Sequence, residues 1–170
     1  VLQDAIGFAV VEPERIEATL DTIYDLASLT KVLVTTLLCA KLIENSEIDL
    51  ERFIDFYLSE FKKTSDFKDD ILIEELLIHK TYLVAWKPFY LSNKSRFEIL
   101  NDIIKTPFNW DQQIVTYSDL NFLTLTFMLE KIRGERIDKI AQTEIFDPLN
   151  LQNTFFNPPK SLQKQIAASE

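Results

Sequence analysis

Apolar residues recur at helical spacing from residue 28 to residue 44 and cover nearly the whole circumference of the predicted helix. We therefore expect a central, buried helix in this segment. Asn45 follows its last turn as a left-handed C-cap. Weaker patterns predict further helices at about 73–79, 95–105, 119–133 and 136–146, the third of which ends before Gly134.

Strand signals are scarce by comparison. Residues 5–12 alternate weakly between polar and apolar positions, which predicts one strand, while residues 49–61 are helical or irregular. One or two strands beside five or six helices cannot satisfy their own backbone groups without sheet partners. We expect an α+β fold in which residues 1–170 form a single, incomplete domain, mostly the helical region with one or two strands of a missing antiparallel sheet.

Two polar side chains, Ser28 and Lys31, lie at the mouth of the apolar helix, three residues apart and so on one face. An ammonium that loses hydration among Leu and Val side chains has a lowered pKa and can act as a base. A serine hydroxyl becomes a nucleophile when such a base takes its proton. Backbone N–H groups in the first helical turn would favour the oxyanion of acyl transfer.

A structural explanation of the same residues is equally simple. Serine is a common N-cap, and a lysine near a helix end can extend its ammonium to water. The pattern Ser-x-x-Lys also starts at Ser59, Ser65 and Ser161, in or beside a charged loop or in the polar tail. Because the pattern occurs four times, it leaves both explanations open by itself. Only the pattern at Ser28 opens a long apolar helix, which distinguishes it from the others.

Four segments resemble, in the right order, the serine β-lactamase and penicillin-binding-protein superfamily, in its class C-like branch with esterases and D-amino-acid peptidases. Residues 22–50 are similar to the first motif region, which contains Ser-x-x-Lys. Residues 71–86 resemble a segment that ends in a His-Thr-Ser-Gly-Leu type of turn. Residues 115–134 are similar to a Tyr-x-Asn motif with its following helix, and residues 145–159 to a Pro-Leu-Gly stretch.

The resemblance implies a β-lactamase/transpeptidase-like fold and a role for each matching residue. Ser28 would be the acylated nucleophile, Lys31 its proton partner and Tyr117 the second acid/base group, with Asp119 in the substrate-binding position. The structural alternatives are that Tyr117 is an aromatic staple before the next helix, and that Ser118 or Asp119 caps this helix.

Several positions depart from the family pattern. Asp119 replaces the usual Asn, and an ionised carboxylate cannot donate a hydrogen bond to a substrate carbonyl. Tyr82 replaces a Gly, so either this residue is strained at positive φ or the turn has changed shape. Asn45 and Asn150 replace glycines with a residue that tolerates the left-handed region.

A third family motif, Lys-Thr-Gly or His-x-Gly on a sheet strand, is absent, because Gly7 and Gly134 follow Ala5 and Ile132 at the required spacing. Its strand supplies one oxyanion N–H in the family. We expect this stretch of chain to be inactive on its own, since losing one such donor costs about 3–4 kcal/mol of transition-state stabilisation.

Composition narrows the range of partners. The net charge of −9, without a cluster of Lys and Arg, argues against binding to nucleic acid or an anionic membrane. No apolar run reaches the roughly 18 residues of a membrane span. Cys39 and His79 are each the only residue of their type, which excludes disulfides and His/Cys metal sites within one chain. The N-terminus has no signal-peptide pattern, so cell envelope and cytoplasm both remain open.

The sequence therefore predicts a serine hydrolase that forms an acyl-enzyme on a small ester, amide or β-lactam substrate, without a metal or cofactor. The aromatic loop from Tyr82 to Tyr90 either lines the acyl pocket or forms a surface cluster. The alternative function is a non-catalytic binding or assembly module that retains part of the fold. Such a module would form a homo-oligomer or recruit a complementing chain, because missing strands expose apolar faces and a sheet edge.

Overall fold

A computed structural model describes residues 2–62 and 67–169. Its core is built around α5 (Asp119–Arg133), which has the bounds that the sequence predicts. Ser118 caps its start by accepting the Asn121 backbone N–H at 3.4 Å, and Gly134 ends it with φ of 70°. One face of α5 is buried along its length, through Leu120, Asn121, Phe122, Thr124, Leu125, Met128 and Leu129.

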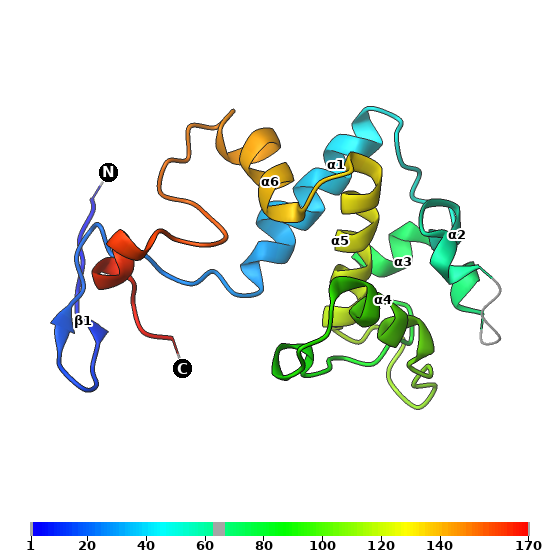
Figure 1. Cartoon of the computed structure of the whole chain (residues 1–170), viewed down its shortest axis with the longest axis horizontal. Helices are drawn as coiled ribbons and strands as arrows, with labels where there is room; N and C mark the ends of the chain where they lie inside the picture. Colours follow the sequence, from blue (N-terminus) through cyan, green and yellow to red (C-terminus); the bar gives the residue numbers. More distant parts are fainter. Residues whose placement is uncertain (1, 63–66, 170) are drawn as a thin grey trace.

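Four shorter helices surround α5 and contact it, as Figure 1 shows. The expected helices at 73–79, 95–105 and 136–146 are confirmed, the last continuing as a π-helical segment over Gln142–Phe146. The segment 49–61 contains one helix and a 3-10 turn, Ser59–Phe61. The four helices are α2 (Ile54–Tyr57), α3 (Ile73–Leu77), α4 (Arg96–Lys105) and α6 (Ile137–Ala141).

The apolar helix begins at Leu29, continues as a π-helical segment over Lys31–Thr36, and ends as α1 (Leu37–Glu44). Its inner face is buried in the core through Val34, Leu38, Cys39 and Leu42. Its outer face is exposed at Leu29, Val32, Leu33 and Leu37. The prediction of a helix buried on all sides is therefore wrong, because the described residues pack against one side only.

The left-handed residue after α1 is Ser46, with φ of 59°, and not Asn45, whose φ is −80°. The Glu47 backbone N–H then reaches back to the Leu42 carbonyl at 2.8 Å. Asn45 is thus the C-cap, as predicted, but the left-handed conformation falls on the next residue. At the second predicted position, Asn150 is left-handed, with φ of 54°.

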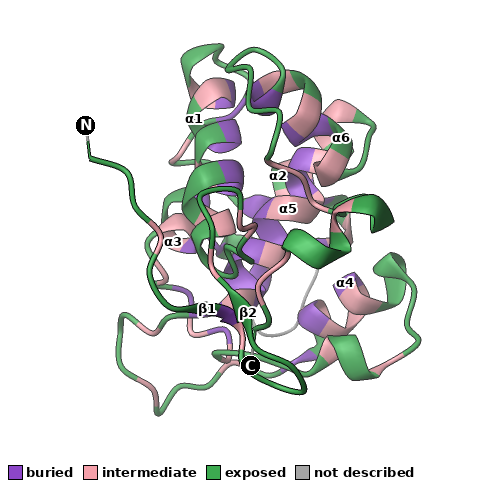
Figure 2. Cartoon of the chain, turned by 90° about the vertical axis from the view of Figure 1, so that its left-hand side faces the viewer, coloured by how far each residue is buried: buried purple, intermediate pink, exposed green. Residues whose placement is uncertain are grey.

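The only strands in the described residues are β1 (Phe8–Val10) and β2 (Ile16–Glu17), which form an antiparallel hairpin. A 3-10 helix, Lys160–Gln165, lies beside this hairpin at one end of the molecule (Figure 1), and the Ala168 N–H donates to the Ala9 carbonyl at 2.9 Å. The sequence did not predict this helix. The hairpin is largely exposed (Figure 2), so the two strands alone bury little apolar surface.

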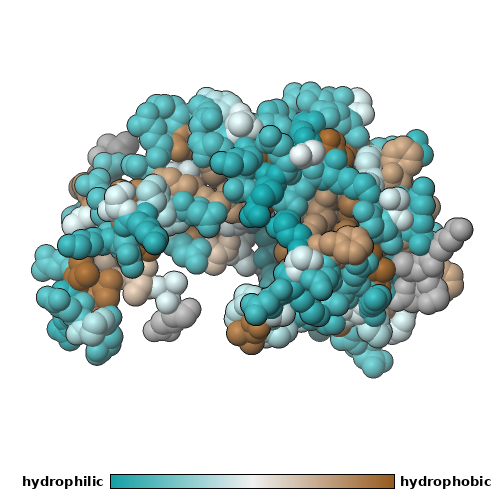
Figure 3. Space-filling model, in the orientation of Figure 1, coloured by the Kyte–Doolittle hydropathy of each residue, from teal (hydrophilic) through white to brown (hydrophobic). Residues whose placement is uncertain are grey.

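A notch separates the side chains of this end from the helical body in the space-filling view of Figure 3. Hydrophobic side chains reach the surface on both sides of it. No helix within the described residues is long and apolar enough to cross a bilayer.

The position of the left-handed residue gives a stability prediction. Ser46→Gly should raise the free energy of unfolding by about 1 kcal/mol, because glycine adopts positive φ without a steric penalty. Asn45→Gly is the matched control and should lower it, since this residue has ordinary negative φ and its side chain donates to Glu47. Urea unfolding of both variants measures the difference; the opposite order would contradict the cap assignment.

Candidate active site

A strained turn places Ser28 at the start of the apolar helix. Ala27 precedes it with φ of 43°, a conformation that costs energy for any residue with a Cβ. The Asp25 carboxylate holds this turn by accepting the Ala27 backbone N–H at 2.8 Å. Asp25 was not among the predicted site residues, although an Asp two residues before such an N–H is the usual pattern of an Asx turn.

Lys31 lies one turn further along and joins the predicted site residues. Its Nζ donates to the Ser28 Oγ at 3.1 Å and to the Asp119 Oδ1 at 2.7 Å. The same ammonium lies 5.0 Å from the centre of the Tyr117 ring. The structure therefore brings all four predicted site residues together, two from the apolar helix and two from the start of α5.

The electrostatics of Lys31 differ from the sequence expectation. Burial of its ammonium lowers the pKa, but interactions with Asp119 and then with Tyr117 outweigh this effect and raise the pKa above 10.5. The predicted lowering is wrong because the carboxylate of Asp119 stabilises the charged form. Lys31 is thus an ammonium at neutral pH. In this form it donates a hydrogen bond to the Ser28 Oγ and cannot accept the serine proton.

The loop that follows α3 forms hydrogen bonds with the start of α5. The Ser118 Oγ donates to the Val84 carbonyl at 2.8 Å, and the Asp119 N–H donates to the Ala85 carbonyl at 2.7 Å. Tyr82, in this loop, has φ of 58° and packs its ring against Trp110 at 5.0 Å. The turn therefore keeps the positive φ that the family pattern assigns to glycine, and Tyr82 carries the strain.

His79 begins this loop and lies behind Tyr117. Its ring centre is 4.7 Å from that of Tyr117, and its Nδ1 accepts the Ser118 backbone N–H at 3.1 Å. The aromatic residues further along the loop stay at the surface, with Trp86 and Tyr90 both exposed. A surface cluster therefore describes these two residues better than a buried pocket wall.

The two other Ser-x-x-Lys patterns that lie within the described residues form no comparable arrangement. The Ser59 Oγ accepts a hydrogen bond from Lys131 at 3.2 Å, and Ser161 lies in the exposed 3-10 helix near the C-terminal end. Ser65 lies outside the described residues. Among the serines of this pattern that the structure describes, only Ser28 lies beside a lysine that also contacts Asp119.

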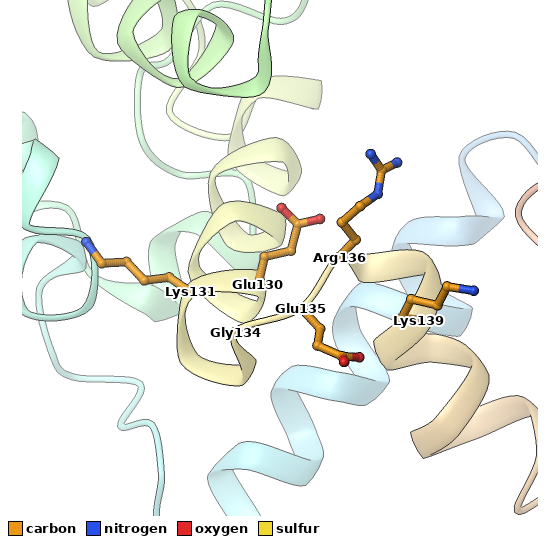
Figure 4. Close-up of a pocket in the computed structure, with 6 residues that line it drawn as sticks. All are labelled: Glu130, Lys131, Gly134, Glu135, Arg136 and Lys139. Atoms are coloured by element: carbon orange, nitrogen blue, oxygen red, sulfur yellow. The ribbon is translucent and has the colours of Figure 1, made fainter.

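A separate hollow of about 470 Å³ lies where α5 ends and α6 begins, as Figure 4 shows. It contains none of the predicted site residues. Three of its charged side chains form ion pairs: Glu130 with Arg96, Lys131 with Glu60 and Arg136 with Asp138. Its lining consists of Glu130, Lys131, Gly134, Glu135, Arg136 and Lys139.

A sequence model of the β-lactamase family matches residues 1–170, the whole chain. The chain belongs to the β-lactamase family. A protein of Salmonella gallinarum named "Putative D-alanyl-D-alanine carboxypeptidase" is 32% identical over 191 aligned residues, which cover all of this chain and 44% of that protein. This β-lactamase family chain thus spans less than half the length of the curated relatives that it matches.

Solved structures confirm the fold of this β-lactamase family member. The crystal structure of FmtA from Staphylococcus aureus matches with a TM-score of 0.78 and 28% identity, over 89% of this chain and 42% of that one. A class C β-lactamase matches with a TM-score of 0.80 and 15% identity, over 95% of this chain and 44% of that one. The expected α+β, β-lactamase/transpeptidase-like fold, mostly helical with few strands, is therefore confirmed.

The ion pair of the site gives a direct electrostatic prediction. Asp119→Asn should lower the pKa of Lys31, because the neutral amide no longer stabilises the ammonium while burial still opposes it. Titration of the lysine side chain by heteronuclear NMR measures this pKa. Asp138→Asn, which removes a carboxylate paired with Arg136 instead, should leave it unchanged. An unaltered Lys31 titration in Asp119→Asn would contradict the ion pair.

Proposed function

We propose that the protein is a serine hydrolase in which Ser28 attacks an ester, amide or β-lactam carbonyl and becomes acylated. The observation that carries this proposal is the 3.1 Å contact between the Lys31 Nζ and the Ser28 Oγ at the start of a helix. Membership of the β-lactamase family and the likeness to a protein named as a D-alanyl-D-alanine carboxypeptidase support it.

The proposed reaction uses three side chains in sequence. The Ser28 Oγ bonds to the carbonyl carbon while its proton moves to the neutral amine of Lys31, and the carbonyl oxygen gains the electron pair. As the bond to the leaving group breaks, the Tyr117 hydroxyl passes a proton to that group and is reprotonated from Lys31. Water then attacks the acyl carbon, its proton is taken up by the same pair, and the Ser28 oxygen leaves with a proton.

Asp119 shapes both the rate and the choice of substrate in this proposal. Its carboxylate is engaged with Lys31 and cannot donate a hydrogen bond to a substrate amide carbonyl. We therefore propose esters, which need no donor to an amide carbonyl, as better substrates than β-lactams. Because Asp119 keeps Lys31 charged, only a small fraction of molecules carries the neutral amine at pH 7.

Covalent labelling tests the nucleophile. Incubation with a nitrophenyl ester or a fluorescent β-lactam should add the acyl mass to Ser28, and Ser28→Ala should abolish the adduct. We expect slow labelling at pH 7, because Asp119 keeps Lys31 charged and the neutral amine that accepts the Ser28 proton is the minor form. Peptide mapping by mass spectrometry identifies the labelled residue.

Ser161→Ala is the matched control for this experiment. It removes another serine of the same Ser-x-x-Lys pattern, from an exposed 3-10 helix, and should leave labelling unchanged. An adduct that persists in Ser28→Ala, or a wild-type protein that acquires no adduct at all, would rule out the proposed nucleophile.

The pH dependence of labelling tests the role of Lys31. Since the reactive amine is the minor form below its raised pKa, the acylation rate should rise about tenfold per pH unit between pH 7 and 9. Asp119→Asn should shift this profile towards lower pH. Stopped-flow measurement of the acylation rate gives both profiles, and a flat profile for the wild type would exclude Lys31 as the base.

The exposed outer face of the apolar helix favours a second candidate function, an assembly module without turnover. Leu33 and Leu37 from this face line a groove of about 1020 Å³, together with Ile145 and Leu149. A module of this kind would cover the groove with a second copy or a complementing chain. Concentration-dependent association in sedimentation experiments, combined with the absence of a Ser28 adduct, would favour it over the hydrolase.

A further inference from the structure

His79 contacts the segment that carries Tyr117 at three points. Its backbone carbonyl accepts the Thr116 N–H at 3.1 Å, and its Nδ1 accepts the Ser118 N–H at 3.1 Å. Between these two bonds, its ring lies 4.7 Å from the Tyr117 ring. The residues on both sides of Tyr117 and the phenol ring itself are therefore fixed to one histidine.

The histidine is itself held in place. Its φ of 59° fixes the direction of the chain after α3, and its ring also lies 5.1 Å from that of Phe122, one turn into α5. Its side chain forms no hydrogen bond with Ser28 or Lys31, and its Nδ1 is engaged with the Ser118 N–H. The contacts of His79 with the active site therefore run through Tyr117 and its neighbours.

The hydrogen bond to Ser118 requires a particular protonation state. Nδ1 can accept only if it carries no proton, so the neutral ring has its hydrogen on Nε2. Burial and then the positive charge of Lys31 lower the pKa of His79 below 6.5, while Asp119 opposes this shift. Lys31, Asp119 and Tyr117 are the titratable groups that face it. A proton on Nδ1 would face the Ser118 N–H, so that two donors would meet and the hydrogen bond between Ser118 and His79 would break.

We propose that His79 is a positioning residue, whose neutral imidazole accepts the Ser118 amide hydrogen and so holds Tyr117 beside Lys31 and Ser28. This inference rests on the proposed acyl transfer, in which Tyr117 relays the proton. Acidification should break this hydrogen bond, which we call the His79 clamp. As the pH falls below 6.5 through the pKa of His79, Nδ1 gains a proton, the Ser118 bond is lost and the phenol moves away from the ammonium.

Two variants separate the acceptor atom from the ring. In His79→Asn, the amide oxygen can take the place of Nδ1, does not titrate and tolerates positive φ, so acylation should stay within about threefold of the wild type. In His79→Phe, the ring remains but the acceptor is lost, so acylation should fall about tenfold through misplacement of Tyr117. Circular dichroism and thermal unfolding check that both variants fold.

The acylation rate measured between pH 5 and 8 distinguishes positioning from a general structural role. Around the pKa of His79, the slope of log rate against pH should steepen from about one to about 1.5 in the wild type, because a second protonation then slows the reaction up to about tenfold. It should stay near one in His79→Asn. Equal slopes in the two proteins, or equal rates for His79→Asn and His79→Phe, would overturn the proposal.

An NMR titration makes this outcome independent of acylation. The chemical shift of the Ser118 amide proton should titrate with the same midpoint as that of the His79 ring, because the His79 Nδ1 accepts this proton in a hydrogen bond. A Ser118 amide that ignores the His79 titration would overturn the clamp even if Ser28 is acylated. A coupled titration in a protein whose Ser28 acquires no label would instead overturn the proposed hydrolase function, and with it the role of His79 in the reaction.

Discussion

The contact between the Lys31 ammonium and the Asp119 carboxylate, at 2.7 Å, is the interaction on which the rest of the site depends. It joins the first turn of the apolar helix to the first turn of α5, two elements that are distant in the sequence. With Lys31 fixed in this way, its remaining hydrogens can reach the Ser28 oxygen and lie close to the Tyr117 ring. Without it, the Lys31 side chain, which is 16% exposed, would be free to turn towards water.

One partner in this contact, Asp119, is also the main departure from the family pattern that the sequence resembles, which has an Asn at this position. The consequence is electrostatic, because an ammonium beside a carboxylate resists deprotonation more than one beside an amide. Strained backbone surrounds the site, with positive φ at Ala27, His79 and Tyr82. Such strain persists only where hydrogen bonds and packing over-determine the conformation, and here the bonds from Asp25 and around Ser118 do so.

Local features could be predicted from the sequence, and features set by distant residues could not. The predicted bounds of α5 were correct at both ends, because a serine cap, a hydrophobic period of 3.6 residues and a terminal Gly134 all act within a few residues. The sign of the Lys31 pKa shift was wrong because it depends on Asp119, which only the fold brings near. The π-helical turn at 31–36 and the pairing of Ala168 with Ala9 also come from tertiary packing, which no periodicity encodes.

The most direct test of the central claim is a crystal structure of the protein treated with an aryl boronic acid, which forms a tetrahedral adduct with an activated serine. The account predicts continuous density from the Ser28 Oγ to boron, with the Lys31 Nζ between that oxygen and the Asp119 carboxylate. An unmodified Ser28, with the Lys31 ammonium in bulk solvent and separated from Asp119, would contradict it.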